Sequence, residues 1–181
     1  VTLVGVLLAE LGLRIPDFRA SERTFQLMTQ IAGRAGRAEA PGRMILQTLV
    51  PEHYAIQHAV THDASAFLKE EGELRSALRF PPFGSLALFR LSGQDRERVE
   101  HEAGRMASRL RRIARAELAV QGPMPAPIER VRGKWRYQVL VRSTSRQALG
   151  IALKQIMAED AAERSPSGLQ ISLDVDPYTF L

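Results

Sequence analysis

The chain has 181 residues, 45% of them hydrophobic, which is enough for one large domain or two small ones, and it contains no cysteine, which excludes disulfides and thiolate metal sites. No apolar run reaches the roughly 18 residues of a membrane span and no secretory leader is recognisable, so we expect a cytoplasmic location and no membrane partner. The net charge of +5 favours a nucleic-acid or nucleotide partner, although a merely basic protein surface would also account for it.

The first part of the chain, residues 1–62, has the pattern of half an α/β layer. The apolar run 2–8 predicts a buried strand that begins almost at the first residue, so we expect the sequence to be a fragment. A helix is predicted over about 21–33, where apolar residues recur at helical spacing, and a second strand over 43–50. Strand, helix and strand in this order predict an α/β domain.

Residues 63–84 form a predicted helical connector. Helices are expected over 53–61 and 63–79, and the second ends at the sequence FPPFG because consecutive prolines cannot continue a helix. A change of pattern follows at Ser85, so the domain boundary is expected within this segment.

Residues 85–181 have the pattern of an α+β domain. Strands are predicted over 85–92, 127–132, 135–142 and 169–175, and helices over 95–117 and 145–159. The resulting order, βαββαβ, is that of ferredoxin-like folds. Thr144 and Gln147 stand in capping-box register at the start of the last helix.

The sequence QIAGRAGR at 30–37 is the strongest candidate for chemistry. Arg34 and Arg37 lie one helical turn apart, and Gln30 lies one turn earlier, so all three can face one way. Two guanidinium groups and an amide in this arrangement suit a triphosphate whose charge must be neutralised during transfer. A helix end with solvated arginines is the alternative.

Alternation of period two divides the segment 134–142 into two faces. One face carries two aromatic rings and two valines, which favour a core position, although the tryptophan would also suit a stacked nucleobase: Trp135, Tyr137, Val139 and Val141. The opposite face and the preceding turn carry the cations that we take as candidate nucleic-acid-binding residues: Lys134, Arg136, Arg142 and Arg132.

Arg146, near the start of the last helix, lies beside amides left free at a helix N-terminus, so it is either a carboxylate-binding residue or an ordinary exposed arginine.

Three other groups of residues give weaker signals. His58 and His62 lack a third ligand and predict no metal site. The arginines at 105, 109, 111, 112 and 115 favour a solvated face over phosphate contact. Asp174 and Asp176 favour structural hydrogen bonds beside a turn at Pro177.

Several motifs resemble those of a known family. The pattern at 30–37 resembles the sixth motif of superfamily 2 helicases, and the run from Val1 to Arg37 resembles primosomal protein N′, the PriA family of replication-restart helicases. Further matches to the C-terminal region of that family follow in the family's order: FPPF at 80–83, GPMPAPIERVRGKWRYQVLVR at 122–142 and DVDP at 174–177. After the first strand the family usually has an aspartate where this chain has Glu10.

The resemblance implies the end of the second RecA-like helicase lobe followed by a C-terminal domain. The parent would be an ATP-dependent 3′ to 5′ DNA helicase that acts in replication restart and primosome assembly, with ATP, magnesium and zinc as its cofactors. The resemblance also implies that Arg34 and Arg37, supported by Gln30, contact the γ-phosphate of ATP. Forked or single-stranded DNA, other primosome proteins and the tail of single-strand-binding protein, the last at Arg146, would be the partners.

The sequence contains no phosphate loop, no acidic pair for magnesium and no cysteine for zinc, so we expect this chain alone to be inactive as an ATPase. Two other functions stay open on the residues alone. One is a free-standing module that binds single-stranded nucleic acid, and the other is an interaction module for single-strand-binding protein.

Overall fold

The structure is a computed structural model that describes residues 2–35, 42–114, 116–162 and 168–180, with only the backbone described at 160–162. The chain divides into two compact units, Val1–Leu74 and Arg75–Leu181. The division falls within the segment 63–84 that the sequence predicts as a connector. Over the described ranges, no helix is both long and apolar enough to cross a membrane.

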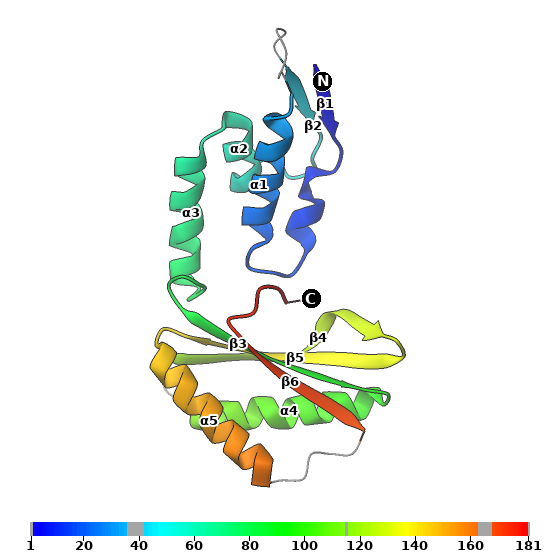
Figure 1. The fold of residues 1–181 in the computed structure, drawn as a ribbon, viewed down its shortest axis with the longest axis vertical. Helices are drawn as coiled ribbons and strands as arrows, with labels where there is room; N and C mark the ends of the chain where they lie inside the picture. The colour runs from blue at the N-terminus through cyan, green and yellow to red at the C-terminus, as the bar shows by residue number, and fades with distance from the viewer. Residues whose placement is uncertain (1, 36–41, 115, 163–167, 181) are drawn as a thin grey trace. The chain divides into compact units, whose positions relative to one another are not determined.

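The first unit contains a two-stranded parallel sheet, in which β1 (Leu3–Val6) pairs with β2 (Arg43–Leu46). The chain segment that connects the two strands contains a 3₁₀-helix, η1 (Ala9–Arg14), and α1 (Ala20–Ala32), as Figure 1 shows. Both strands are shorter than the predicted spans of 2–8 and 43–50. β1 stops early because Leu8 adopts a left-handed backbone, with φ of 52°, and the chain then turns into η1.

Stacked aromatic rings form the centre of the first unit. The ring centroids of Phe25 in α1 and Phe67 in α3 (Ala64–Ala77) are 4.1 Å apart, with the ring planes almost parallel. Tyr54, the first residue of α2 (Tyr54–Thr61), stacks on Phe67 at 5.9 Å. Small and apolar buried residues complete this core: Ala9, Met28, Ala55, Ile56 and Ala59.

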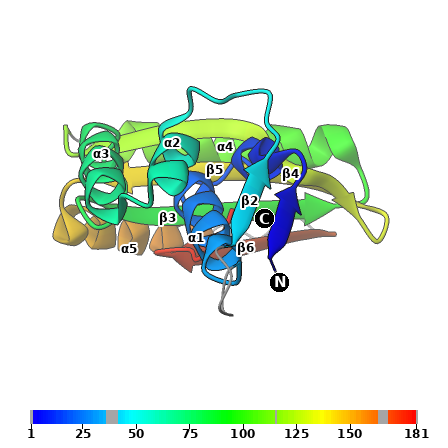
Figure 2. The same ribbon diagram turned by 90° about the horizontal axis from the view of Figure 1, so that it is seen from above.

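The second unit is a mixed α/β structure built on a four-stranded antiparallel sheet. Its strands are β3 (Ser85–Gly93), β4 (Leu118–Val131), β5 (Lys134–Ser143) and β6 (Leu169–Val175), in the spatial order β4-β5-β3-β6. Figure 2 shows these strands running side by side. α4 (Arg96–Ile113) and α5 (Arg146–Ala162) cover the same face of the sheet in Figure 1. The predicted order of elements in this half of the chain is therefore confirmed.

The core of the second unit lies between this sheet face and the two helices. The strands contribute alternate residues, which include Phe89 and Leu91 in β3 and Tyr137, Val139 and Val141 in β5. The helices contribute apolar stripes: Val99, Ala103, Met106 and Leu110 in α4, and Leu149, Leu153 and Ile156 in α5. Full burial of a leucine or valine side chain contributes roughly 1.5–3 kcal/mol relative to exposure, so this layer dominates the stability of the unit.

The predicted start of the strand over 127–132, which corresponds to β4, was wrong. β4 begins at Leu118, not at residue 127, and α4 ends at Ile113, before the predicted residue 117. Three prolines in the sequence GPMPAP argued against a strand here, because proline has no N–H to donate to the neighbouring strand. β4 tolerates them because it lies at the edge of the sheet, where its pairing with β5 shifts register after Gln121 and after Pro125.

The predicted cap of α5 was also wrong. Ser145, and not Thr144, caps the helix, because its Oγ accepts a hydrogen bond from the amide of Ala148 at 3.2 Å. The hydroxyl of Ser143 fixes the approach by accepting a bond from the amide of Ser145 at 3.1 Å. The helix therefore begins at Arg146, which places this arginine in the first turn.

Candidate functional site

Two of the three residues predicted to contact a nucleotide lie at the C-terminal end of α1. Gln30 is exposed in the last turn of the helix, and Arg34 is exposed in the turn that follows it. The amide of Arg34 donates to the carbonyl of Ile31 at 3.1 Å, which continues the helical path past the cap residue Gly33. Arg37 lies outside the described residues. Gln30 and Arg34 thus present an amide and a guanidinium group about one turn apart.

Glu10 is a buried carboxylate to which the sequence assigned no role. It follows β1 in η1, is 2% exposed, and its Oε2 accepts a hydrogen bond from the hydroxyl of Thr48 at 2.9 Å. Its pKa is held below the usual value, chiefly by a hydrogen bond from its own backbone amide, with Thr48 and the amide of Leu49 adding to the effect against desolvation. The ionised carboxylate therefore ties the segments that follow β1 and β2 together.

The hairpin between β4 and β5 gathers cations around a tight turn. Val131 pairs with Lys134, and the two residues between them, Arg132 and Gly133, both have positive φ, at 50° and 80°. Two consecutive left-handed residues are what a type I′ hairpin turn requires, and glycine supplies one of them without steric cost. Arg130, Arg132 and Lys134 are exposed here, and we call these three residues the hairpin tip.

Trp135, the next residue of β5, is half-buried at the rim of the core. The guanidinium group of Arg130, its cross-strand neighbour, lies 5.1 Å from the ring centroid, and that of Arg96 lies 5.0 Å from it. Both distances are in the range of cation–π attraction. The core prediction is thus confirmed for the three residues that follow on this face, while Trp135 itself packs against two arginines, which the sequence did not associate with it.

The predicted basic face of β5 is not an open surface along its whole length. Its central residues Gln138 and Leu140 are 3% and 5% exposed, and the side-chain amide Nε2 of Gln138 donates to the carbonyl of Phe180 at 2.7 Å. Arg142, at the far end, donates to the carbonyl of Leu78 at 2.9 Å and lies over the ring of Phe80. Arg136 is half-buried. Among the four predicted residues, Arg132 and Lys134 are the ones that lie at the hairpin tip.

Arg146 projects from the first turn of α5 with 81% of its side chain exposed, and its Nη2 lies 3.5 Å from Oδ2 of Asp176. The other oxygen of Asp176 accepts a bond from the amide of Leu86 at 3.1 Å, and Asp174 pairs with Arg90 at 3.1 Å. The structural interpretation of these two aspartates is therefore confirmed. A carboxylate already reaches Arg146, and the chain itself supplies it.

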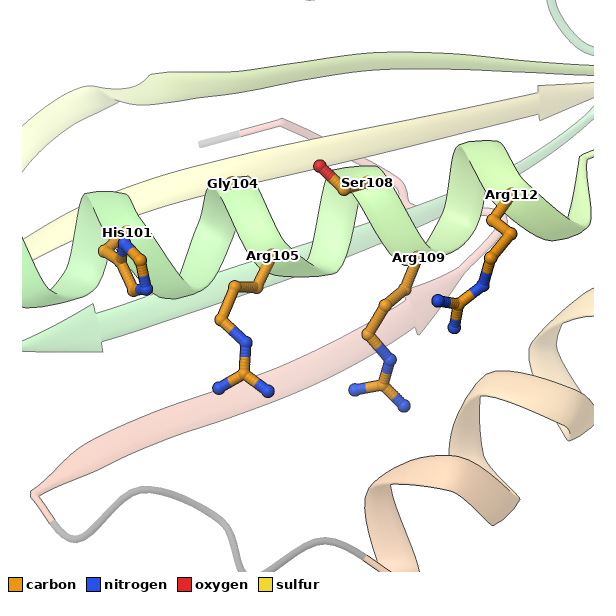
Figure 3. Close-up of a pocket in the computed structure, with 6 residues that line it drawn as sticks. All are labelled: His101, Gly104, Arg105, Ser108, Arg109 and Arg112. Carbon is orange, nitrogen blue, oxygen red and sulfur yellow. The ribbon is translucent and has the colours of Figure 1, made fainter.

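An open groove of about 560 Å³ runs along α4, on the side away from its apolar stripe. Its lining comes from α4 alone, as Figure 3 shows: His101, Gly104, Arg105, Ser108, Arg109 and Arg112. The three arginine side chains project from the same side of the helix (Figure 3). Elsewhere in the described part of the chain, His58 pairs with Glu70 at 2.9 Å, and no cluster of three metal-ligating side chains occurs.

Comparison with known proteins places most of the chain in one family. Residues 76–178 match the family described as the primosomal protein N C-terminal domain. The replication restart protein PriA of Bacillus subtilis is 39% identical over 181 residues, which are 100% of this chain and 22% of that protein. PriA of Synechocystis sp. is 37% identical over 99% of the chain and 21% of that protein, and PriA of Haemophilus influenzae is 35% identical over 98% and 24%. The chain thus spans about a fifth to a quarter of the length of these relatives.

The lowered pKa of Glu10 predicts a pH-dependent contribution to stability. A carboxylate whose pKa is lower in the folded state stabilises the fold above its unfolded value of about 4.5, and this contribution is lost as the pH falls through the lowered pKa. We expect Glu10→Gln to lower the urea midpoint of the first unit at pH 7, and the difference from wild type to narrow at about pH 3. Urea titrations followed by circular dichroism measure the midpoints of the variant and of wild type at pH 7 and at about pH 3. Glu52→Gln, at an exposed carboxylate, is the control, and an equal loss at both pH values would contradict the assignment.

Proposed function

The chain belongs to the PriA family, and we propose that it is the C-terminal part of an ATP-dependent 3′ to 5′ DNA helicase that acts in replication restart and primosome assembly. The observation that supports this most strongly is a similarity that extends over the whole chain, including the QIAGRAGR segment outside the matched C-terminal domain. The two units would then have different tasks, one toward nucleotide and one toward DNA and protein partners.

The first unit is proposed to be the end of the second RecA-like lobe. Arg34 and Arg37 would contact the γ-phosphate of ATP bound by the rest of the parent, with Gln30 supporting them. Guanidinium groups suit this role because they neutralise charge that builds on the transferring phosphoryl group. The chain has no phosphate loop and no cysteine, so its own residues do not fit ATP with magnesium, or zinc, without the parent.

Substitution of these arginines tests the nucleotide role. In the full-length parent, Arg34→Ala or Arg37→Ala should lower ATP turnover by roughly 10³-fold, the scale on which an arginine finger acts. Nucleotide binding should change much less, because the phosphate loop would be intact. Arg43→Ala, at an exposed arginine of β2, is the matched control. ATP turnover by the 181-residue chain alone, abolished by Arg37→Ala, would refute the proposal that the site needs the rest of the parent.

The second unit, proposed to have a ferredoxin-like fold, would contact forked or single-stranded DNA through the hairpin tip. Three exposed cations, Arg130, Arg132 and Lys134, project around one tight turn. The turn and the packing of Arg130 against Trp135 restrain the tip before DNA arrives, which lowers the entropy lost on binding. Such cations supply the sequence-independent phosphate contacts that position a protein on DNA.

Charge reversal at the hairpin tip tests DNA binding. The double variant Arg132→Glu/Lys134→Glu should bind a forked DNA at least about tenfold more weakly than wild type. The slope of log affinity against log salt should fall by about 0.9 for each lost phosphate contact to duplex. Fluorescence anisotropy at several salt concentrations gives both quantities. Lys154→Glu, an exposed cation of α5, controls for net charge, and an affinity equal to that of wild type would count against the site.

A second proposed contact is the acidic, apolar tail of single-strand-binding protein at Arg146. The carboxylate of Asp176 lies 3.5 Å from the guanidinium group, so an intramolecular carboxylate already occupies the position that a tail carboxylate would take. The contact supports a carboxylate ligand at Arg146, because the guanidinium group holds one in this position within the chain.

The competition between the two carboxylates can be measured. Arg146→Glu should weaken binding of a tail peptide at least about tenfold, since a cation–carboxylate hydrogen bond becomes a repulsion. Asp176→Asn should strengthen it, because the competing charge is removed while an oxygen is kept for the amide of Leu86. Anisotropy with a labelled peptide provides the readout, and peptide binding that is insensitive to Arg146→Glu would remove the assignment.

A further inference from the structure

The exposed face of α4 carries a row of polar side chains, most of them cationic, which we call the α4 row: Arg98, His101, Arg105, Ser108 and Arg112. Consecutive members are three or four residues apart, so they lie along one side of the helix. At about 1.5 Å per residue, the row extends roughly 21 Å. Every member of the row except Arg98 also lines the groove of Figure 3. The row is thus long enough to face several successive charges of one ligand.

Gly104 is one of the residues that line this groove, in the interior of an 18-residue helix. Glycine destabilises a helix interior relative to alanine, so its presence there needs a reason. No described heavy atom outside the helix backbone lies within 4 Å of the position that its Cβ would take, so close packing within the described part of the chain is not the reason. A missing side chain at this position instead lets a bound group approach the helix between His101 and Ser108.

Carboxylates hold the arginines of the groove in place, and they leave Arg105 and Arg112, but not Arg109 with 13% of its side chain exposed, accessible to a ligand. Arg109 donates through Nε and Nη2 to the same oxygen of Glu159 in α5, each at 3.2 Å. This contact is the main cause of the lowered pKa of Glu159, which therefore stays ionised. Arg112 lies 3.5 Å from that oxygen with 69% of its side chain exposed, and Arg105 bonds Glu102 with 48% exposed. Side chains ordered in this way lose less entropy when an anion binds.

We propose that the α4 row binds the phosphate backbone of a single DNA strand, as a contact separate from the hairpin tip. The inference rests on the proposed binding of DNA by the second unit. Guanidinium groups and a hydroxyl are phosphate donors, and they outnumber the one ring in the groove, the imidazole of His101, so contact with the backbone rather than with bases is expected.

Continuity with the hairpin tip gives the row its direction. α4 begins at Arg96, whose guanidinium group lies over Trp135, and Trp135 pairs with Arg130 of the tip. The end of α4 that carries Arg98 is therefore the end nearer the tip, and Arg112 stands toward the distal end of the helix. A strand held at the tip would continue along the row toward Arg112, so the tip would bind short DNA and the row would add affinity for longer DNA.

Oligonucleotides of two lengths separate the two contacts. Labelled oligothymidylates of about 5 and about 15 nucleotides would be titrated into the 181-residue chain at low and moderate salt. Arg105→Glu/Arg112→Glu should weaken binding of the longer strand about tenfold and lower its salt slope by about 0.7 for each lost phosphate. Binding of the shorter strand should change by less than about threefold. Lys154→Glu, on the neighbouring helix, should leave both affinities unchanged.

Gly104 provides a variant that does not alter charge. Gly104→Leu should weaken binding of the longer strand, because the leucine side chain would extend into the groove. It should keep or raise the melting temperature, since leucine is a better helix former and open space surrounds the Cβ position. Loss of affinity without loss of stability would support a ligand at this position, whereas a lower melting temperature together with unchanged affinity would overturn it.

The outcomes distinguish this inference from the proposal on which it rests. If hairpin-tip variants lose binding while α4 variants bind both strands like wild type, the inference is wrong and DNA binding by the tip stands. If the wild-type chain binds neither strand in a salt-dependent way, both are wrong. If the α4 variants lose binding of an acidic peptide while retaining that of DNA, the row is a protein-docking surface and the inference is again overturned.

Discussion

One constraint organises the second unit: a single face of its antiparallel sheet is buried under two helices. Alternation along β3 and β5 sends Phe89, Leu91 and Val139 to that face, and α4 must then turn its own apolar stripe toward them. Most of the charged residues of α4 are left on the other side of the helix, although Arg96 reaches the ring of Trp135 and Glu100 accepts a hydrogen bond from Tyr137. The orientation of α4 is therefore set by how the core is covered. Because the helix is held in this orientation, the cations on its far side keep fixed positions along the groove.

Arginines in this unit differ in what their partners leave them able to do. Arg90, 19% exposed at its side chain, bonds Asp174 and the carbonyl of Thr179, and Arg142 bonds the carbonyl of Leu78, so these side chains fasten one segment to another. Arg112 lies 3.5 Å from Glu159 in an exposed pair, and water and salt screen such a pair strongly. An incoming phosphate can therefore replace the carboxylate at little cost. Burial and partner geometry, more than residue type, thus separate a structural arginine from a binding one.

The sequence was sufficient for features with a local cause and insufficient for those with a distant one. Helix and strand periodicity predicted the βαββαβ order and the burial of Tyr137, Val139 and Val141. The first half of β4 was not predicted because its prolines argue against a strand by local rules. Its position at the edge of the sheet, which the sequence does not reveal, is what makes these prolines acceptable. The packing of Arg96 and Arg130 on Trp135, and the bond from Arg109 to Glu159, join residues that the fold alone brings together. Arg130 had one readable signal, its place opposite Trp135 across a short turn.

Two glycines show how a local cost indicates a role. Gly133 has a φ of 80° in a turn that needs left-handed residues, so the hairpin itself explains why no side chain stands there. Gly104 has no such explanation: it costs a helix roughly 0.5–1 kcal/mol relative to alanine, and nothing described lies within 4 Å of its Cβ position. A sequence can keep such a loss where something outside the fold requires the space. Gly150 in α5 has an equally open Cβ position, so it is the place of Gly104 among the residues that line the groove, beside three arginines, that connects this loss with an anionic ligand.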